Sequence, residues 1–184
     1  RDRVGVDRPA TLLIPVPTFT CPLDQIALQG MRAVLLPPTD GSVDPSPEDL
    51  AQVPADVDID GVYMMPVNNP TGRTLSGERL RAFVAAVLDR WPHAGVILDS
   101  VYVRLHPQHR ELVAWYVDEP RIPEAVLVID SQSKTHAGTG LRSGAAYCAV
   151  LSTATVTRTS CPRSPRHCEF AARLAVAARH EDSV

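Results

Sequence analysis

The chain has 184 residues and a formal net charge of −3. This length can bury one sizeable core, and its 45% hydrophobic and 21% charged residues are ordinary for a globular domain. The small acidic excess and the dispersed arginines argue against nucleic acid as a partner. Because no apolar run approaches the roughly 20 residues that span a bilayer, and no signal-peptide core is visible, we expect no membrane partner and a cytoplasmic location.

Short aliphatic runs, each bounded by Pro, Gly or Asp, recur along the chain and predict buried strands. In chain order they are residues 11–16, 33–36, 62–65, 96–98, 126–129 and 145–151. Buried strands read as continuous apolar runs when helices cover both faces of their sheet.

Segments with helical period lie between these strands. Residues 76–91 place their large apolar side chains on one face, and Ser76 is a natural N-cap. Residues 21–31 and 46–53 are shorter helix candidates, the second opened by Ser46 with Pro47 in its first position. Strand alternating with helix predicts an α/β fold, a three-layer α/β/α arrangement with a mainly parallel sheet.

Three loops follow predicted strands and should converge, because ligands of doubly wound sheets bind beyond the carboxyl ends of the strands. They contain Asn69-Pro-Thr-Gly72, then Asp99 with Tyr102, then the run Ser131-Gln-Ser-Lys-Thr-His-Ala-Gly-Thr-Gly-Leu-Arg-Ser-Gly144. In this order and at these separations, the loops resemble those of the class I and II aminotransferases, members of the fold type I superfamily that uses pyridoxal 5'-phosphate (PLP). The resemblance extends, more loosely, over about residues 11–147.

The resemblance implies catalytic roles for Lys134, Asp99 and Tyr102. Lys134 would form a Schiff base with the PLP aldehyde and later move a proton at the substrate α-carbon. Asp99 would pair with the pyridine nitrogen and keep the ring an electron sink. Tyr102 and Asn69 would hydrogen-bond the phenolic oxygen of the cofactor. Each residue type also has an ordinary interpretation, such as a surface lysine, a turn Asp or Asn, or a core tyrosine.

The same resemblance implies a phosphate site. Arg142 would bind the cofactor phosphate, since a planar guanidinium donates two parallel hydrogen bonds to such an anion, although a surface arginine is the ordinary alternative. Ser131 and Ser133 would add hydroxyl groups, with Ser131 the more direct contact. We expect no metal, because the histidines and cysteines of the chain lack the paired spacing of a zinc site.

Two parts of the family pattern are not recognisable in this chain. Before residue 11 there is no glycine turn and helix for the phosphate, and after residue 151 no arginine stands out as a substrate-carboxylate clamp. We therefore expect residues 1–151 to form a partial cofactor-binding large domain, incomplete at both ends. Residues 152–184 would form a loop and a helix that lead toward a small C-terminal domain. The chain would be a fragment of a larger enzyme, or a short protein completed as a homodimer or by a complementing chain.

The function that follows is a PLP-dependent aminotransferase, which moves an amino group between an amino acid and a keto acid through a Lys134 Schiff base. Decarboxylases, cyclases and lyases share the same large-domain residues, so another PLP reaction is an alternative. A truncated, non-catalytic subunit with this fold is a second alternative.

Overall fold

A computed structural model describes residues 8–107, 109, 121–137 and 144–148. Within these residues, a six-stranded sheet has the order β2-β1-β3-β4-β5-β6. The strands are β1 (Thr11–Pro15), β2 (Arg32–Leu36), β3 (Gly61–Met64), β4 (Gly95–Asp99), β5 (Val126–Ser131) and β6 (Gly144–Cys148). All pairs are parallel except β5 with β6, so the mainly parallel sheet is confirmed.

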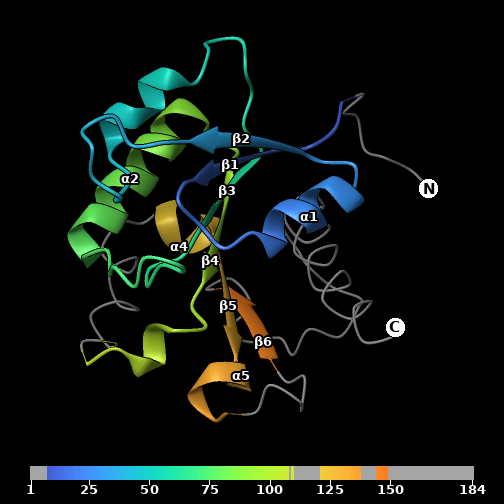
Figure 1. The fold of residues 1–184 in the computed structure, drawn as a ribbon. Helices are drawn as coiled ribbons and strands as arrows, with labels where there is room; N and C mark the ends of the chain where they lie inside the picture. Colours follow the sequence, from blue (N-terminus) through green and yellow to red (C-terminus); the bar gives the residue numbers. More distant parts are fainter. Residues whose placement is uncertain (1–7, 108, 110–120, 138–143, 149–184) are drawn as a thin grey trace.

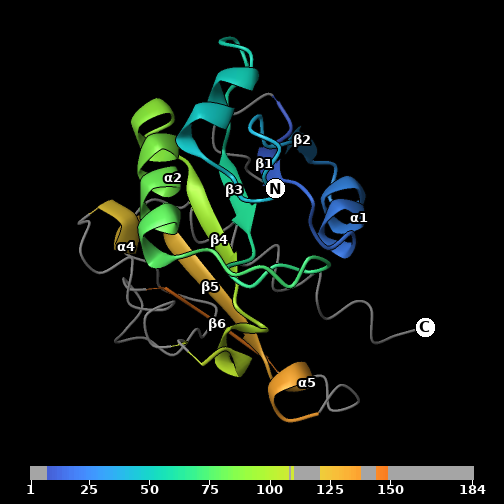
Figure 2. The same cartoon turned by 60° about the vertical axis from the view of Figure 1, so that its left-hand side comes forward.

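Helices cover the sheet on both faces (Figures 1 and 2). Helix α1 (Cys21–Leu28) lies on one face, over a core that includes Ile14, Tyr63 and Ile97. The other face carries α2 (Gly77–Arg90), the 3-10 helix η1 (Pro47–Gln52) and the short α4 (Arg121–Ala125), over the larger core cluster. The predicted α/β/α layering is therefore present in the described residues.

Helix α2 follows the sequence pattern closely. The Ser76 side chain accepts a hydrogen bond from the Arg79 amide at 3.2 Å and caps the first turn. The predicted apolar face is buried against the sheet by Leu80, Phe83, Val84, Val87 and Leu88. Beyond the helix, buried Trp91 donates its indole N–H to the Val57 carbonyl at 3.2 Å.

The segment predicted as a helix at 46–53 forms a 3-10 helix. Buried Asp49 accepts hydrogen bonds at 2.7 Å from the Ser46 amide and from both the amide and the hydroxyl of Thr39. Burial by itself raises the pKa of Asp49, but the bonds from Thr39 and Ser46 outweigh it and lower the pKa below its usual range. Side-chain bonds to neighbouring loops thus hold a turn that is too short for a stable α-helix.

The other short helix prediction, residues 21–31, overshoots at its end. Helix α1 stops at Leu28, and Gly30 has a φ of +67°. Glycine adopts this left-handed conformation without steric cost, so it provides a natural stop.

Strand β2 differs from the prediction in its burial. It was expected to be a buried strand, but it lies at the edge of the sheet, and Arg32, Ala33 and Leu35 are exposed. At the other edge, β6 begins at Gly144, where an added Cβ would lie 2.8 Å from the Asp130 carbonyl oxygen. Only glycine allows the two backbones to approach this closely.

Three short elements were not predicted: η2 (Val103–Leu105) follows β4, α4 (Arg121–Ala125) precedes β5, and α5 (Gln132–Thr135) follows β5 directly. Residues 149–151 of the sixth predicted strand, the loop expected at 153–166 and the helix expected at 167–180 lie outside the described residues. No helix in the described part of the chain is both long and apolar enough to cross a membrane.

Candidate active site

Three segments meet beyond the carboxyl ends of β3, β4 and β5, and the one after β5 is the short helix α5. The Ser100 amide donates to the Ile129 carbonyl at 2.7 Å, which joins the segment after β4 to β5. The Asn69 side-chain amide lies 3.5 Å from the Tyr102 hydroxyl, a long hydrogen bond. The Lys134 Nζ lies 5.9 Å from the centre of the Tyr102 ring, within cation–π range. Tyr102 therefore stands between the other two side chains.

The loop that carries Asn69 is held in shape by its own backbone and by Asn68. The amide of Gly72 donates to the Asn68 carbonyl and the Leu75 amide to the Pro66 carbonyl, at 2.8 and 2.9 Å. Gly72 has a φ of +70°, which favours glycine at this turn. The Asn68 side chain donates to the Pro17 carbonyl at 2.9 Å and accepts from the Thr71 hydroxyl. These bonds fix the loop against the segment after β1.

An ion-pair cluster supports the same loop from the side. Buried Asp44 accepts hydrogen bonds from Arg73 at 2.7 and 3.1 Å and from Arg79 at 3.2 Å. Arg73 follows the loop and Arg79 lies in the first turn of α2. One buried carboxylate thus connects the 38–46 segment, the Asn69 loop and α2.

Asp99 ends β4 and is partly buried. Its Oδ1 accepts a hydrogen bond from the Val101 amide at 3.2 Å, and its Oδ2 accepts one from the Tyr63 hydroxyl at 2.7 Å. Burial raises the pKa of Asp99 and the charge of Asp130 adds to this, whereas the bonds from Tyr63 and Val101 act in the opposite direction. The net pKa lies above the usual range of an aspartate.

Ser131, Ser133 and Lys134 lie where β5 passes into α5. The Ser131 hydroxyl oxygen accepts from the Ser133 amide at 3.1 Å, and the two hydroxyl oxygens are 2.9 Å apart. Lys134 is exposed. Asp130, just before this turn, pairs with Arg104 at 2.7 Å. Arg142 lies outside the described residues, so its predicted phosphate contact is not placed.

Tyr63, which donates a hydrogen bond to Asp99, is a site residue that the sequence pattern did not predict. A signal was present, because a tyrosine stands within an aliphatic strand run at residues 62–65. A buried tyrosine hydroxyl usually needs a hydrogen-bond partner. Only the folded chain identifies that partner as Asp99, which is 36 residues away.

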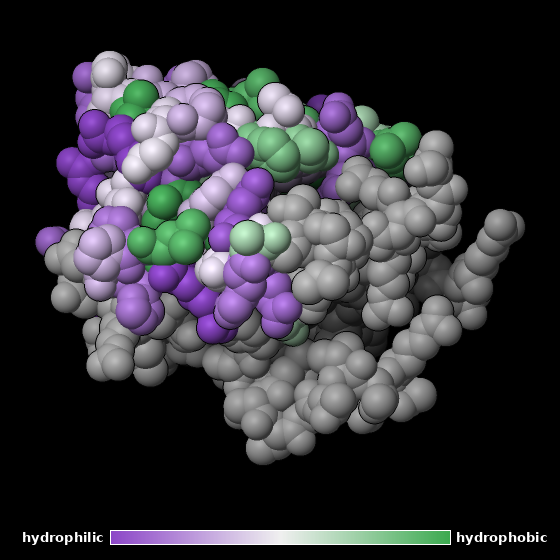
Figure 3. Space-filling model, turned by 60° about the horizontal axis from the view of Figure 1, so that its bottom comes forward, coloured by the Kyte–Doolittle hydropathy of each residue, from purple (hydrophilic) through white to green (hydrophobic). Residues whose placement is uncertain are grey.

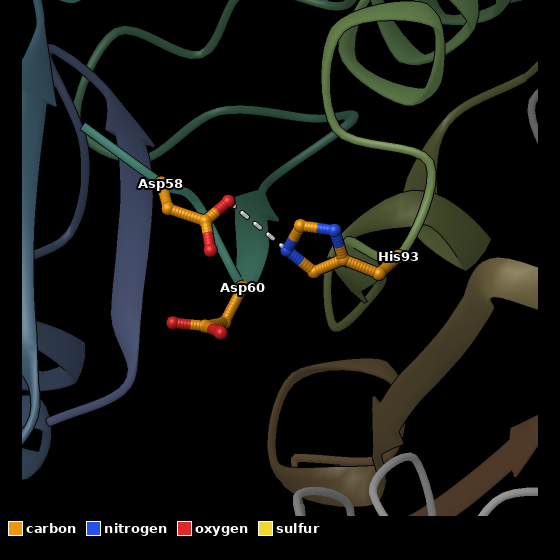
Figure 4. Close-up of side chains that lie close together, drawn as sticks. All are labelled: Asp58, Asp60 and His93. Atoms are coloured by element: carbon orange, nitrogen blue, oxygen red, sulfur yellow. Dashed lines mark ion pairs between the residues drawn. The ribbon is translucent and has the colours of Figure 1, made fainter. Parts of the chain in front are cut away.

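A separate group of metal-ligating side chains lies at the amino ends of the strands. Asp58 and Asp60 precede β3 and His93 precedes β4, with ligand atoms all within 4.8 Å of one another (Figure 4). Arg8 donates to Asp58 at 2.5 Å and to Asp60 at 2.7 Å, and the Thr11 amide also donates to Asp60. His93 pairs with Asp58 at 3.2 Å. The arginine already compensates these carboxylates, so we interpret the group as an ion-pair network.

The lower surface of the molecule mixes polar and apolar side chains. On this face, small apolar patches lie among polar side chains (Figure 3). Large exposed apolar side chains in the described residues are Phe19, Leu28, Leu35 and Leu105.

Comparison with known proteins agrees with this architecture. The family model described as aminotransferase class I and II matches residues 5–182. No curated protein sequence matches the chain. Among solved structures, the aspartate aminotransferase from Rhizobium meliloti is similar at a TM-score of 0.66 and 21% identity, over 96% of this chain and 39% of that chain.

Two other similar structures are an aminotransferase and a C-S lyase. An aminotransferase from Mycobacterium tuberculosis matches at a TM-score of 0.59 and 23% identity, over 77% of this chain and 35% of that one. The PLP-bound C-S lyase from Staphylococcus hominis matches at a TM-score of 0.62 and 16% identity, over 77% of this chain and 36% of that one. The chain therefore spans less than half the length of these relatives. Because the family model matches residues 5–182 of this chain, and because the sheet has the architecture of the large domain, the chain belongs to the aminotransferase class I and II family.

Proposed function

We propose that this chain carries the cofactor-binding part of a PLP-dependent aminotransferase, which moves an amino group between an amino acid and a keto acid. The observation that carries the proposal is the grouping around Tyr102. The Asn69 amide nitrogen lies 3.5 Å from the Tyr102 hydroxyl oxygen, and Lys134 Nζ lies 5.9 Å from the centre of the Tyr102 ring. Asp99 ends the strand just before this tyrosine. These are the residue types that the chemistry requires.

The donors and acceptors of the site fit PLP. A protonated pyridine nitrogen needs a carboxylate, and each oxygen of Asp99 has accepted one bond and retains a further lone pair. The phenolic oxygen of PLP needs hydrogen-bond donors, which Tyr102 and Asn69 offer. The phosphate needs hydroxyl and cationic groups, for which we propose Ser131, Ser133 and Arg142.

The chemistry then divides among the residues of this chain. PLP, when bound, supplies an electron sink for the α-carbon of an amino acid. Lys134 would hold the cofactor covalently and, once released by the substrate amine, would remove the α-proton and return it to another carbon. Tyr102 and Asn69 would orient the ring, and Asp99 would hold the proton on the ring nitrogen.

Other parts of the sequence interpretation stay predictions. These are the domain division at residues 1–151 and 152–184, the amino acid or keto acid substrate, the cytoplasmic location and the homodimer or complementing chain. A second candidate function is a PLP-dependent lyase, which is favoured by the structural similarity to a C-S lyase. A non-catalytic subunit is the third.

Lys134 offers a sharp test because it is the only lysine among the 184 residues. The purified chain is mixed with PLP, its visible spectrum is recorded, and the adduct is reduced with borohydride and mapped by mass spectrometry. We expect one adduct on Lys134. Lys134→Arg keeps the positive charge but has no amine that condenses with an aldehyde, so it should lose both the spectrum and the adduct.

The outcome that contradicts the proposal is equally clear. If the adduct forms only on the N-terminal amine, or not at all, the assignment of Lys134 is wrong. When the Lys134 adduct does form, amino acids are added as donors. Accumulation of the aminated cofactor indicates transamination, whereas release of a thiol from a sulfur-containing amino acid indicates the lyase.

A further inference from the structure

Tyr63 lies on the strand next to that of Asp99, and its side chain reaches the Asp99 carboxylate. It belongs to β3, is only 5% exposed, and is paired in register with Ile97 on β4. Side chains alternate along a strand, so Ile97 and Asp99 share the face that also carries Tyr63. From this position the Tyr63 hydroxyl reaches the Asp99 Oδ2 at 2.7 Å, the shorter of the two hydrogen bonds on that carboxylate.

The surroundings of Asp99 otherwise favour its neutral form. Burial raises the pKa of Asp99, and the nearby Asp130 raises it further, although Asp130 is itself paired with Arg104. The Tyr63 hydroxyl and the Val101 amide donate to the ionised form and so counteract this tendency. A neutral Asp99 could not hold a proton on a ring nitrogen.

Tyr63 is suited to donate rather than to ionise. Burial raises its pKa well above the usual range, and the charge of Asp99 raises it further. The phenol therefore keeps its proton and points it at Asp99. Among the residues that the structure describes, the other titratable groups that act on this pair are Asp130, Tyr102 and Cys21.

We propose that Tyr63 is a positioning residue, which keeps Asp99 ionised and turned toward the ring nitrogen of the cofactor. This inference rests on the function proposed above for Asp99. In this proposal Tyr63 acts through the carboxylate of Asp99, which accepts its hydroxyl hydrogen bond. The hydrogen bond to Asp99 also explains why a buried tyrosine stands in an otherwise apolar strand, since a buried hydroxyl needs a partner.

The first test needs no cofactor. The chain is labelled with ¹³C at its aspartate carboxyl carbons, and the Asp99 resonance, assigned by its loss in Asp99→Asn, is followed against pH. In Tyr63→Phe the ring stays and only the hydroxyl is lost, so the pKa of Asp99 should rise. Met64→Leu, a nearly volume-conserving change on the same strand in the opposite core, should leave that pKa where it was.

A second variant works in the opposite direction. Site-specific 3-fluorotyrosine at position 63 has a more acidic hydroxyl and should donate more strongly, so the pKa of Asp99 should fall. This variant preserves the shape of the core, so it remains informative if Tyr63→Phe does not fold. An Asp99 pKa that moves in neither variant overturns the proposal.

The cofactor provides the third measurement. We expect the PLP dissociation constant of Tyr63→Phe to rise on the order of tenfold, and the visible spectrum of the bound cofactor to change with pH over a shifted range. If the wild-type chain forms no Lys134 adduct, the proposed function fails, and the role of Tyr63 toward a cofactor fails with it. If the adduct forms and Tyr63→Phe matches the wild type in affinity and in Asp99 titration, only the role of Tyr63 is overturned.

Discussion

At the scale of single residues, Asp99 carries opposing demands. In the role that we propose, Asp99 must be ionised to pair with a ring nitrogen, yet its position at the end of a buried strand disfavours the charged form. Tyr63 and Val101 offset part of this cost, and the pKa of Asp99 still lies above its usual range. Such a perturbed group is typical of a functional site, where stability is given up for chemistry.

This leads to a prediction on stability and pH for the cofactor-free chain. The folded-state pKa of Asp99 is raised above its usual value of 3.8, so the folded chain binds more protons than the unfolded chain above that pH, and ionisation of Asp99 lowers stability as pH rises. Asp99→Asn cannot ionise and lacks this penalty. In urea unfolding, the free energy of unfolding of Asp99→Asn should increase relative to that of the wild type as pH rises from about 4 to about 8. A difference that stays constant with pH would contradict this.

At the scale of elements, α2 depends on a single apolar face. Phe83 is fully buried in the centre of that face, among Leu80, Val84 and Val87. Ser76 caps the start of the helix, and Arg90 near its end donates to the carbonyls of η1 and of the residue after it. The helix is therefore secured at both ends and along its length.

We expect Phe83→Ala to lower the free energy of unfolding by about 4 kcal/mol, because it removes a large side chain from a close-packed core. Chemical denaturation followed by far-UV circular dichroism measures the change. Ala82→Gln, on the exposed side of the same helix, should stay within about 0.5 kcal/mol of the wild type. Equal losses in the two variants would mean that this face does not carry the packing.

At the scale of the whole molecule, the two ends of the strands serve different purposes. Asp99 is the last residue of β4, and Asn69 and Lys134 lie on the segments that follow β3 and β5, so all three stand at the carboxyl ends of the strands. The amino ends carry the network of Arg8 with Asp58 and Asp60, which connects the segment before β1 to the segment that leads into β3. We propose that the side chains at the carboxyl ends bind a ligand, whereas the ion pairs at the amino ends hold strands together.

We expect Arg8→Ala to cost about 1 kcal/mol of stability, because two neighbouring carboxylates lose their shared cation. The loss should shrink at about 1 M salt, which screens their repulsion. Arg8→Lys should recover only part of it, since one ammonium group cannot reproduce the two-pronged contact of a guanidinium. Thermal unfolding at low and high salt measures these differences. A loss that is independent of salt would mean that Arg8 acts through packing alone.

The secondary structure and the end of the sheet that carries the candidate site could be predicted from the sequence alone, because the relevant signals are local. The apolar runs predicted each of the six strands found in the described part of the chain, and the pattern from Ser76 to Trp91 predicted α2 with its cap and its buried face. The three motif loops placed Asn69, Asp99, Tyr102 and Lys134 at the same end of the sheet, because parallel strands bring their carboxyl ends together.

Tertiary structure decided what depends on neighbours distant in sequence. The edge position of β2 exposes an apolar run that looked buried, and the turn at 46–53 became a 3-10 helix because Thr39 and Asp49 meet there. The apolar runs do not reveal the order of the strands in the sheet, so they could not show that Tyr63 contacts Asp99. Local pattern specifies elements and motifs, whereas the charge state of Asp99 depends on which strands become neighbours.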